Sequence, residues 1–240
     1  MGPEAKNRSL IGHDDIPHLP QLRGGTSLVT HPAVQDFATF VTTRYIPPAG
    51  KRVALFLPCT SKKPYSSSRT YRTINSVLTG FPPDAADVIH VLTVSEPLGV
   101  VPAELERAYP AAHYDMVLKT WFPIRRSRTG NFTSKKGQLT SEDRRCLDLV
   151  VDRVFRFLNR LSGHYEFFVG YVRGSQRRML EIAAERASVR VIYPLAGLET
   201  SAISNRPGTV NWALNGLRMP ESLNALETCL GKCLRAIACV

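Results

Sequence analysis

The fold of this chain is decided by the stretch Val53-Ala54-Leu55-Phe56-Leu57-Pro58-Cys59-Thr60-Ser61-Lys62-Lys63-Pro64-Tyr65. Its first five residues form a short, continuous apolar run bounded by turn-forming residues, which is typical of a buried parallel strand. The residues that follow carry a thiol, two ammonium groups and a phenol. Because ligands of open α/β sheets bind at the carboxyl ends of the strands, these side chains are predicted to lie where such folds bind their ligands.

Three further apolar runs predict strands, with helical patterns between them. The predicted strands cover 53–57, 88–94, 165–172 and 189–195, and the predicted helices begin at His31 and cover about 71–78, 103–108, 140–161, 176–186 and 223–240. Strands that alternate with helices imply a mostly parallel, right-handed wound sheet with helices on both faces. We therefore expect an α/β fold of three layers, an αβα sandwich.

The 240 residues divide by composition into three parts. Residues 1–30 mix Pro, Gly, His and charged residues and predict a flexible leader, 31–200 hold the α/β domain, and 201–240 form an extension that ends in a helix. No run approaches the ~18 apolar residues that span a bilayer, and the first residues lack an apolar signal core. We expect a soluble, cytoplasmic protein without a membrane partner.

The chain is strongly basic, with a formal net charge of +11. Residues 119–190 hold 16 Lys and Arg against 7 Asp and Glu, so most of the excess lies there. A polyanion is the natural partner of such a surface, and a solvated face that keeps the protein soluble is the alternative. The candidate nucleic-acid-binding residues are Arg125, Arg126, Arg128, Lys135, Lys136, Arg177 and Arg178.

Five cysteines, an odd number, argue against a disulfide framework. Cys146 lies in a helical pattern and is predicted to be a small core residue. Cys229 and Cys233 share one helical face, but no second Cys or His pair stands near them at the spacing of a zinc site. No metal site and no cofactor are predicted.

The opening stretch also carries a family resemblance. It resembles the Pro-Cys-x-x-x-Lys-Pro-Tyr-x-x-Ser-x-x-His motif of archaeosine synthase, an archaeal tRNA-modifying enzyme. Pro58, Cys59, Lys63, Pro64, Tyr65 and Ser68 match it, and Tyr71 replaces the final His. The segments 95–102 and 109–115 are also similar to that family's core domain, so the resemblance covers roughly residues 31–200.

The resemblance implies a substrate and a reaction. The family acts on tRNA that carries 7-cyano-7-deazaguanine and adds free lysine, or here another amine, to the nitrile. By this resemblance, we expect the core domain to resemble the uracil-DNA glycosylase-like fold. Full-length members also carry transglycosylase-like and RNA-binding PUA domains, whose signatures this chain lacks. We therefore expect a stand-alone or divergent member, with a separate subunit of either kind as a candidate partner.

The motif residues receive candidate roles in this chemistry. Cys59 is the candidate nucleophile, and the adjacent lysines are expected to lower the pKa of its thiol. Lys63 is expected to stabilise the thiolate or transfer a proton, while Tyr65 and Ser68 hydrogen-bond the base or the developing nitrogen anion. The structural alternatives are a buried Cys that ends a strand, a Tyr65 ring packed beneath the loop, and a serine that caps a helix.

The other two segments supply the remaining candidates. Ser95, Pro97, Leu98, Gly99 and Tyr71 are the candidate substrate-binding residues, with Gly99 allowing a close backbone approach; the alternative is a rigid strand-to-helix connection. His113 is a candidate general base or base-edge contact, with Asp115 beside it or on the ammonium of the incoming lysine. A satisfied structural histidine is the alternative.

Two competing functions stay open beside this reading. One is a non-catalytic module that binds tRNA or another nucleic acid and has diverged at Tyr71, since a tyrosine does not replace a histidine acid or base near neutral pH. The other is a divergent enzyme that uses the same pocket on another deazapurine or nucleobase.

Overall fold

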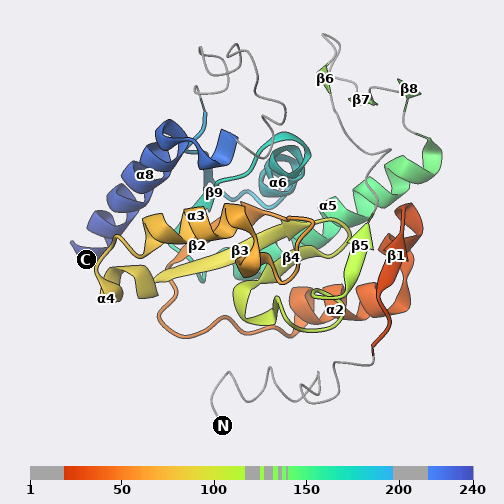
Figure 1. Cartoon of the computed structure of the whole chain (residues 1–240), viewed down its shortest axis with the longest axis horizontal. Coiled ribbons are helices and arrows are strands. Elements are labelled where there is room, and N and C mark those ends of the chain that lie inside the picture. Colours follow the sequence, from red (N-terminus) through yellow and green to blue (C-terminus); the bar gives the residue numbers. More distant parts are fainter. Residues whose placement is uncertain are drawn as a thin grey trace.

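The computed structural model describes residues 19–116, 125–126, 132–134, 137–138, 140–196 and 216–239; for 125–126, 132–134 and 137–138 it describes the backbone alone. Its centre is a five-stranded sheet in the order β10-β9-β2-β3-β4 (Figure 1). The strands are β2 (Val53–Pro58), β3 (Ile89–Ser95), β4 (Gly99–Pro102), β9 (Phe167–Gly170) and β10 (Val191–Ile192). All neighbours are parallel except β3 and β4, which are antiparallel. The mostly parallel sheet confirms the predicted α/β class.

The central strand β2 is buried at all six positions. Its register pairs Leu55 with Val91 of β3 on one side and with Val169 of β9 on the other. A strand enclosed on both edges and both faces requires a continuous apolar sequence, and this requirement explains why the run at 53–57 predicted the strand.

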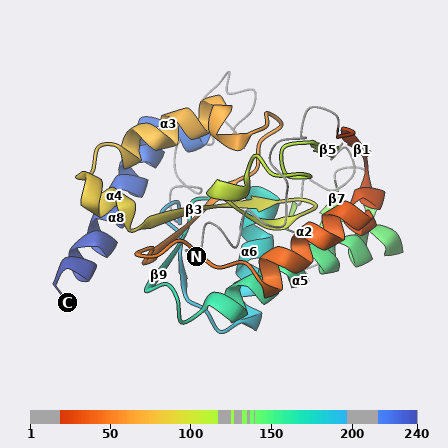
Figure 2. The ribbon, with the colours of Figure 1, turned by 90° about the horizontal axis from the view of Figure 1, so that it is seen from below.

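Helices cover both faces of the sheet. Figure 2 shows α3 (Arg69–Leu78) and α8 (Pro220–Ala238) on one side and α2 (Pro32–Thr43), α5 (Ser141–Leu161) and α6 (Gly174–Arg186) on the other. Buried residues of both helix layers and of the sheet form one core cluster. The three-layer arrangement is therefore confirmed.

Helix α5 begins where its sequence predicts, and α3 begins at Arg69, two residues before the predicted start. Thr140 caps α5 through a capping box, because its side chain accepts from the Asp143 N–H while the Asp143 carboxylate accepts from the Thr140 N–H. Ser68 caps α3 by accepting a hydrogen bond from the Tyr71 N–H at 3.2 Å. A cap of this kind contributes about 1 kcal/mol to helix stability.

Several short elements differ from the sequence prediction. The predicted leader reaches residue 30, but β1 (Leu22–Gly24) pairs with β5 (Tyr114–Met116), and η2 (Thr26–Thr30) places Leu28 and Val29 in the core. The predicted 103–108 helix is a single 3-10 turn, η4 (Ala103–Leu105). Other short elements are η3 (Tyr65–Ser67), α4 (Pro83–Asp87) and η6 (Gly216–Arg218).

The basic region 119–190 contains three short antiparallel strands near its start. They are β6 (Arg125–Arg126), β7 (Phe132–Ser134) and β8 (Gly137–Gln138). The terminal helix α8 buries Leu226, Leu230 and Ile237 in the common core. Among the described residues no helix combines the length and apolarity needed to cross a membrane.

Candidate functional site

The candidate site lies where three parallel strands end. Cys59 directly follows β2, Glu96 directly follows β3, and the amino end of α6 follows β9. The chain passes from β2 to β3 on one side and places β9 on the other, so the strand order reverses at β2. Open α/β sheets bind ligands in the crevice at such a switch point.

Three polar side chains meet at this point and form what we call the Cys59–Glu96–Gln176 cluster. The Cys59 thiol donates to Glu96 Oε2 at 3.3 Å, and Gln176 Nε2 donates to Cys59 Sγ at 3.0 Å and to Glu96 Oε2 at 3.1 Å. Ser175 Oγ donates to Glu96 Oε1 at 3.3 Å. Glu96 is only 2% exposed, and these bonds supply the partners that a buried carboxylate requires.

The Cys59 thiol is held protonated, contrary to the sequence expectation. Burial raises its pKa well above the ordinary value, and the negative charge of Glu96 raises it further. Lys63 lowers the pKa of this thiol, but its effect is smaller than the other two. The sequence showed the lysines three and four residues away and did not show Glu96. A neutral thiol beside a carboxylate is a nucleophile with its own base, since the carboxylate can take the proton as sulfur attacks.

Lys63 is partly buried in the same region. Its ammonium donates to the Thr60 carbonyl and lies 4.8 Å from the ring centre of Tyr65 and 4.4 Å from that of Tyr114. Burial lowers its pKa, while the charges of Cys59, Asp115 and Glu96 act in the opposite direction. An ammonium whose pKa is lowered releases its proton more readily, which suits a proton donor.

Tyr65 belongs to a buried hydroxyl triangle. Its hydroxyl lies 3.2 Å from Ser95 Oγ and 2.9 Å from the Tyr114 hydroxyl, and Ser95 Oγ lies 2.5 Å from the Tyr114 hydroxyl. Burial raises the pKa of Tyr65 and of Tyr114, so both phenols stay neutral. The triangle ties the loop after β2, which carries Cys59, Lys63 and Tyr65 and is called the motif loop below, to β3 and β5 directly beneath the Lys63 ammonium.

Ser68 and Tyr71 hold the motif loop in place through the start of α3. Ser68 is 5% exposed, and its side chain caps α3. The Tyr71 hydroxyl donates to the Pro58 carbonyl at 3.2 Å and lies 2.6 Å from Thr93 Oγ1, and its ring stacks on Tyr65 at 6.0 Å. Tyr71 thus fixes the backbone immediately before Cys59, a role that needs no acid or base.

Within the candidate substrate-binding segment 95–102, Ser95 and Glu96 lie at the site, while Pro97 and Gly99 pack against α5. The Pro97 carbonyl accepts from Arg153 Nη1 at 2.5 Å, and Leu98 is 1% exposed in the core. Gly99 has φ +86°, and a Cβ there would lie 2.6 Å from the Cβ of Arg153. The close approach predicted at Gly99 is therefore made by helix α5, and residues 99–102 form β4 rather than a loop.

Arg153 itself departs from the sequence pattern. A charged residue in an amphipathic helix is expected on the solvent side, but Arg153 is 9% exposed and donates to the Val29 carbonyl at 2.7 Å as well as to Pro97. Burial lowers the pKa of its guanidinium to about 10. Arg153 is thus an anchor between α5, η2 and the turn that carries Glu96.

The structure does not gather the remaining candidates at the cluster. His113 is half-buried with its ring 5.8 Å from that of Tyr109, and its Nδ1 is buried without a hydrogen bond. Asp115 is exposed on β5, where its charge acts on Lys63. Arg177 and Arg178 both pair with Glu181. The side chains of Arg125 and Arg126 and all of Arg128, Lys135 and Lys136 lie outside the described residues.

Sequence reasoning missed Glu96, Ser175, Gln176 and Tyr114. Glu96 stood inside the segment Ser95-Glu96-Pro97 and directly after an apolar run, so its position at a strand end was a usable signal. Gln176 is 117 residues from Cys59 in the chain, and only the strand order brings the two together.

Cavities also lie elsewhere among the described residues. One cavity of about 680 Å³ lies between α5 and α6, and another of about 440 Å³ lies between the ends of β9 and β10 and helix α8. Within the described ranges no group of three or more His, Cys, Asp or Glu side chains is placed to hold a metal ion. Cys146 is buried as predicted, and the five cysteines are free thiols.

Comparisons with known proteins match the same part of the chain. Residues 34–138 match a family described as a domain of unknown function (DUF5591). Archaeosine synthase subunit alpha of Methanosarcina acetivorans is 32% identical over 161 residues, which are 67% of this chain and 21% of that protein. Archaeosine synthase of Haloferax volcanii is 41% identical over 85 residues, which are 35% of this chain and 13% of that protein.

A solved structure, that of AF0587, described as a protein of unknown function, aligns with a TM-score of 0.48 at 21% identity over 81% of this chain and 49% of that chain. The chain spans about a fifth or less of the length of the curated relatives named here. The matched domain contains Cys59, Lys63 and Glu96. By this domain, the chain belongs to the archaeosine synthase family.

Proposed function

We propose that this domain modifies tRNA in archaeosine biosynthesis by adding an amine, lysine in the family, to the nitrile of 7-cyano-7-deazaguanine. The names of the relatives support the pathway. The observation that carries the chemistry is the Cys59–Glu96–Gln176 cluster at the switch point of the sheet. A nitrile carbon is an electrophile, and a thiol with an adjacent base is a suitable nucleophile for it.

The first proposed step forms a covalent thioimidate. Cys59 Sγ bonds to the nitrile carbon while Glu96 Oε2, 3.3 Å from the sulfur, takes the thiol proton. One π pair of the C≡N bond moves to nitrogen, which takes a proton from the Lys63 ammonium. Gln176 Nε2 donates to the sulfur at 3.0 Å and stabilises the charge that develops there.

The second proposed step releases the enzyme. The amine attacks the thioimidate carbon and transfers one proton to Lys63. The tetrahedral intermediate then breaks its C–S bond, and the leaving sulfur regains the proton held by Glu96. The product is a substituted amidine, and the sum of the two steps is the addition of an amine N–H across the nitrile. No oxidant or reductant is consumed.

Delivery of tRNA is a separate part of the proposal. The relatives are several times longer than this chain, and a transglycosylase-like or PUA-containing subunit is the proposed partner that docks the tRNA. The chemistry of the cluster itself requires only the flipped base and the amine.

The deciding experiment is incubation of the protein with tRNA that contains 7-cyano-7-deazaguanine and isotope-labelled lysine, followed by nucleoside mass spectrometry. We expect a labelled lysine adduct, its loss in Cys59→Ala, and a protein–RNA thioimidate that accumulates when lysine is omitted. Full activity of Cys59→Ser would exclude covalent catalysis. A label that enters only from another amine, or only on another nucleobase, would move the domain to a divergent reaction.

The raised pKa of Cys59 favours a second candidate, a non-catalytic tRNA-binding module. In that case the thiol is a structural donor to Glu96. The two candidates differ in one measurement, because a binding module retains tRNA affinity and gives neither a lysine adduct nor a trapped thioimidate.

A further inference from the structure

The cavity of about 680 Å³ between α5 and α6 has an arginine-rich lining that the proposed chemistry does not use. Its residues are Ser141, Arg144, Arg145, Asp148, Leu149, Asp152 and Arg186. We name this cavity the α5–α6 groove. Three guanidinium groups from two helices converge on it, and guanidinium is the side-chain group best matched to phosphate oxygens.

The lining of the groove carries three guanidinium groups against two carboxylates, so its formal net charge is +1. Asp152 accepts from Arg156 Nε at 2.6 Å and from Arg186 Nη2 at 3.1 Å, so two cations offset its charge. Asp148 is the other carboxylate of the lining. Among the described residues neither Arg144 nor Arg145 forms an ion pair, and both are exposed. These two guanidiniums are available to an external anion.

The Arg186 side chain is held in place at the groove. It lies 4.4 Å from the ring centre of Phe155 and also pairs with Asp152. A cation fixed by two partners loses less conformational entropy on binding than a free surface arginine. The groove therefore combines one oriented guanidinium with two free ones.

Helix α6 links this groove to the reactive cluster. Gln176, which donates to the Cys59 sulfur, lies at the amino end of α6, and Arg186 is its last residue. Ten residues of helix span about 15 Å. An RNA whose modified base reaches Cys59 therefore has its backbone within a few nucleotides of the groove.

We propose that the α5–α6 groove binds the phosphodiester backbone of the RNA substrate, at a site separate from the reactive cluster. This inference rests on the proposed function for the identity of the RNA. The contact between guanidinium groups and phosphates does not depend on the proposed reaction. Phosphate contacts of this kind fix the position of a nucleic acid and carry no sequence information. The ligand class is a polyanionic RNA strand rather than a free nucleotide.

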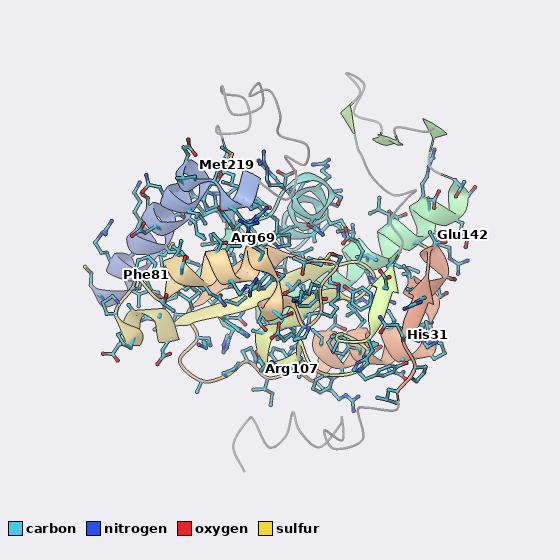
Figure 3. All side chains as sticks on the ribbon, viewed as in Figure 1. His31, Arg69, Phe81, Arg107, Glu142 and Met219 are labelled. Atoms are coloured by element: carbon cyan, nitrogen blue, oxygen red, sulfur yellow. The ribbon has the colours of Figure 1, made fainter. Side chains whose placement is uncertain are left out.

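The test is the salt dependence of binding to an unmodified tRNA transcript. The variant Arg144→Gln/Arg145→Gln removes two groove charges, and Arg44→Gln/Arg107→Gln removes two exposed charges elsewhere as the matched control. Figure 3 places Arg107 far from Glu142, which lies in the first turn of α5 beside the groove. Thermal unfolding of both variants is the check that the fold is retained.

Each phosphate contact with a single-stranded region contributes about 0.7 to the slope of log affinity against log salt. The groove variant is expected to reduce the slope by about 1.4, so that between about 50 and 200 mM salt it loses about sevenfold less affinity than the unmutated protein does. The control is expected to keep the original slope. Equal slopes for the two variants would overturn the proposal.

The outcome is independent of the proposed reaction, because the transcript carries no nitrile. A groove variant with a reduced slope and a protein that transfers no lysine would contradict the reaction and support the groove. An unchanged slope together with normal lysine addition would contradict the groove alone.

Discussion

The pKa of the Cys59 thiol is set by the groups that surround the sulfur rather than by the residues next to Cys59 in the chain. Burial and the carboxylate of Glu96 together raise the thiol's pKa more than Lys63 lowers it. A desolvated group responds most strongly to the nearest charge, because the effective dielectric constant around it is low. The sulfur is therefore kept neutral until a base removes its proton.

Replacing Glu96 with Gln is expected to lower the pKa of the Cys59 thiol, because the negative neighbour is lost and Lys63 remains. Each unit by which the pKa falls raises the thiolate fraction at a given pH about tenfold. Iodoacetamide alkylation of Cys59, followed by peptide mass spectrometry against pH, should show a midpoint at lower pH. The same charge change at Glu181 is the control. An unmoved midpoint in Glu96→Gln would contradict the role given to this carboxylate.

Arg153 is expected to act on the same thiol through the turn that carries Glu96. In Arg153→Met the Pro97 and Val29 carbonyls lose their donor, and the alkylation midpoint should shift in the direction expected for Glu96→Gln. The double variant should add little to either single change, since both act through one carboxylate. Additive shifts would show that Arg153 does not position Glu96.

Arg153→Met should also destabilise the fold, by about 2–5 kcal/mol, because it leaves two buried carbonyl groups without a donor. Urea unfolding measures this change. Arg156→Met on the exposed side of α5 is the control, and loss of its ion pair with Asp152 should cost about 0.5 kcal/mol or less. Equal losses for the two variants would mean that the buried anchor contributes nothing special.

At the level of elements, the sequence predicted those that burial and periodicity determine locally. The four apolar runs became β2, β3, β9 and β10, and the hydroxyl at Thr140 marked the start of α5. β4 was not predicted, because four residues that begin with Gly and end with Pro resemble a loop until a partner strand is known. The burial of Arg153 was not predicted, because helical periodicity places charged residues on the solvent side of a helix. It does not show the carbonyl groups of other elements to which such a residue can donate.

Gly99 offers a test of the packing between β4 and α5. Gly99→Ala places a Cβ 2.6 Å from the Cβ of Arg153 and also strains a backbone with φ +86°. Overpacking and strain together should cost about 2–4 kcal/mol in urea unfolding. Gly50 has φ +81° and open space around it, so Gly50→Ala measures the strain alone. If both variants lose equal stability, α5 does not press on β4 at this point.

Across the whole molecule, β3 connects two buried polar networks at its opposite ends. Ser95 and Glu96 lie at the carboxyl end beside Cys59, and His90 lies near the amino end. His90 Nδ1 is 2.7 Å from the Tyr165 hydroxyl, and its Nε2 is 3.2 Å from Glu104 Oε2. The sequence placed His90 inside a strand but did not show its partners, which come from elements on either side. The amino-end network has no part in the proposed chemistry, so its contribution should be to stability.

That contribution should depend on pH through Glu104. Burial acts to raise the pKa of this carboxyl group, but the hydrogen bond and charge of His90 and the Tyr45 hydroxyl outweigh it, and the net shift is downward from 4.5. A group whose pKa is lower in the folded state stabilises the fold at pH values above its unfolded pKa, and this stabilisation is lost as the pH falls through the folded value. The free energy of unfolding should therefore decline below about pH 4.5. Glu104→Gln should be less stable at neutral pH and approach the unmutated protein on acidification, as measured by urea titrations across this range. Parallel pH curves for the two proteins would place the acid sensitivity elsewhere.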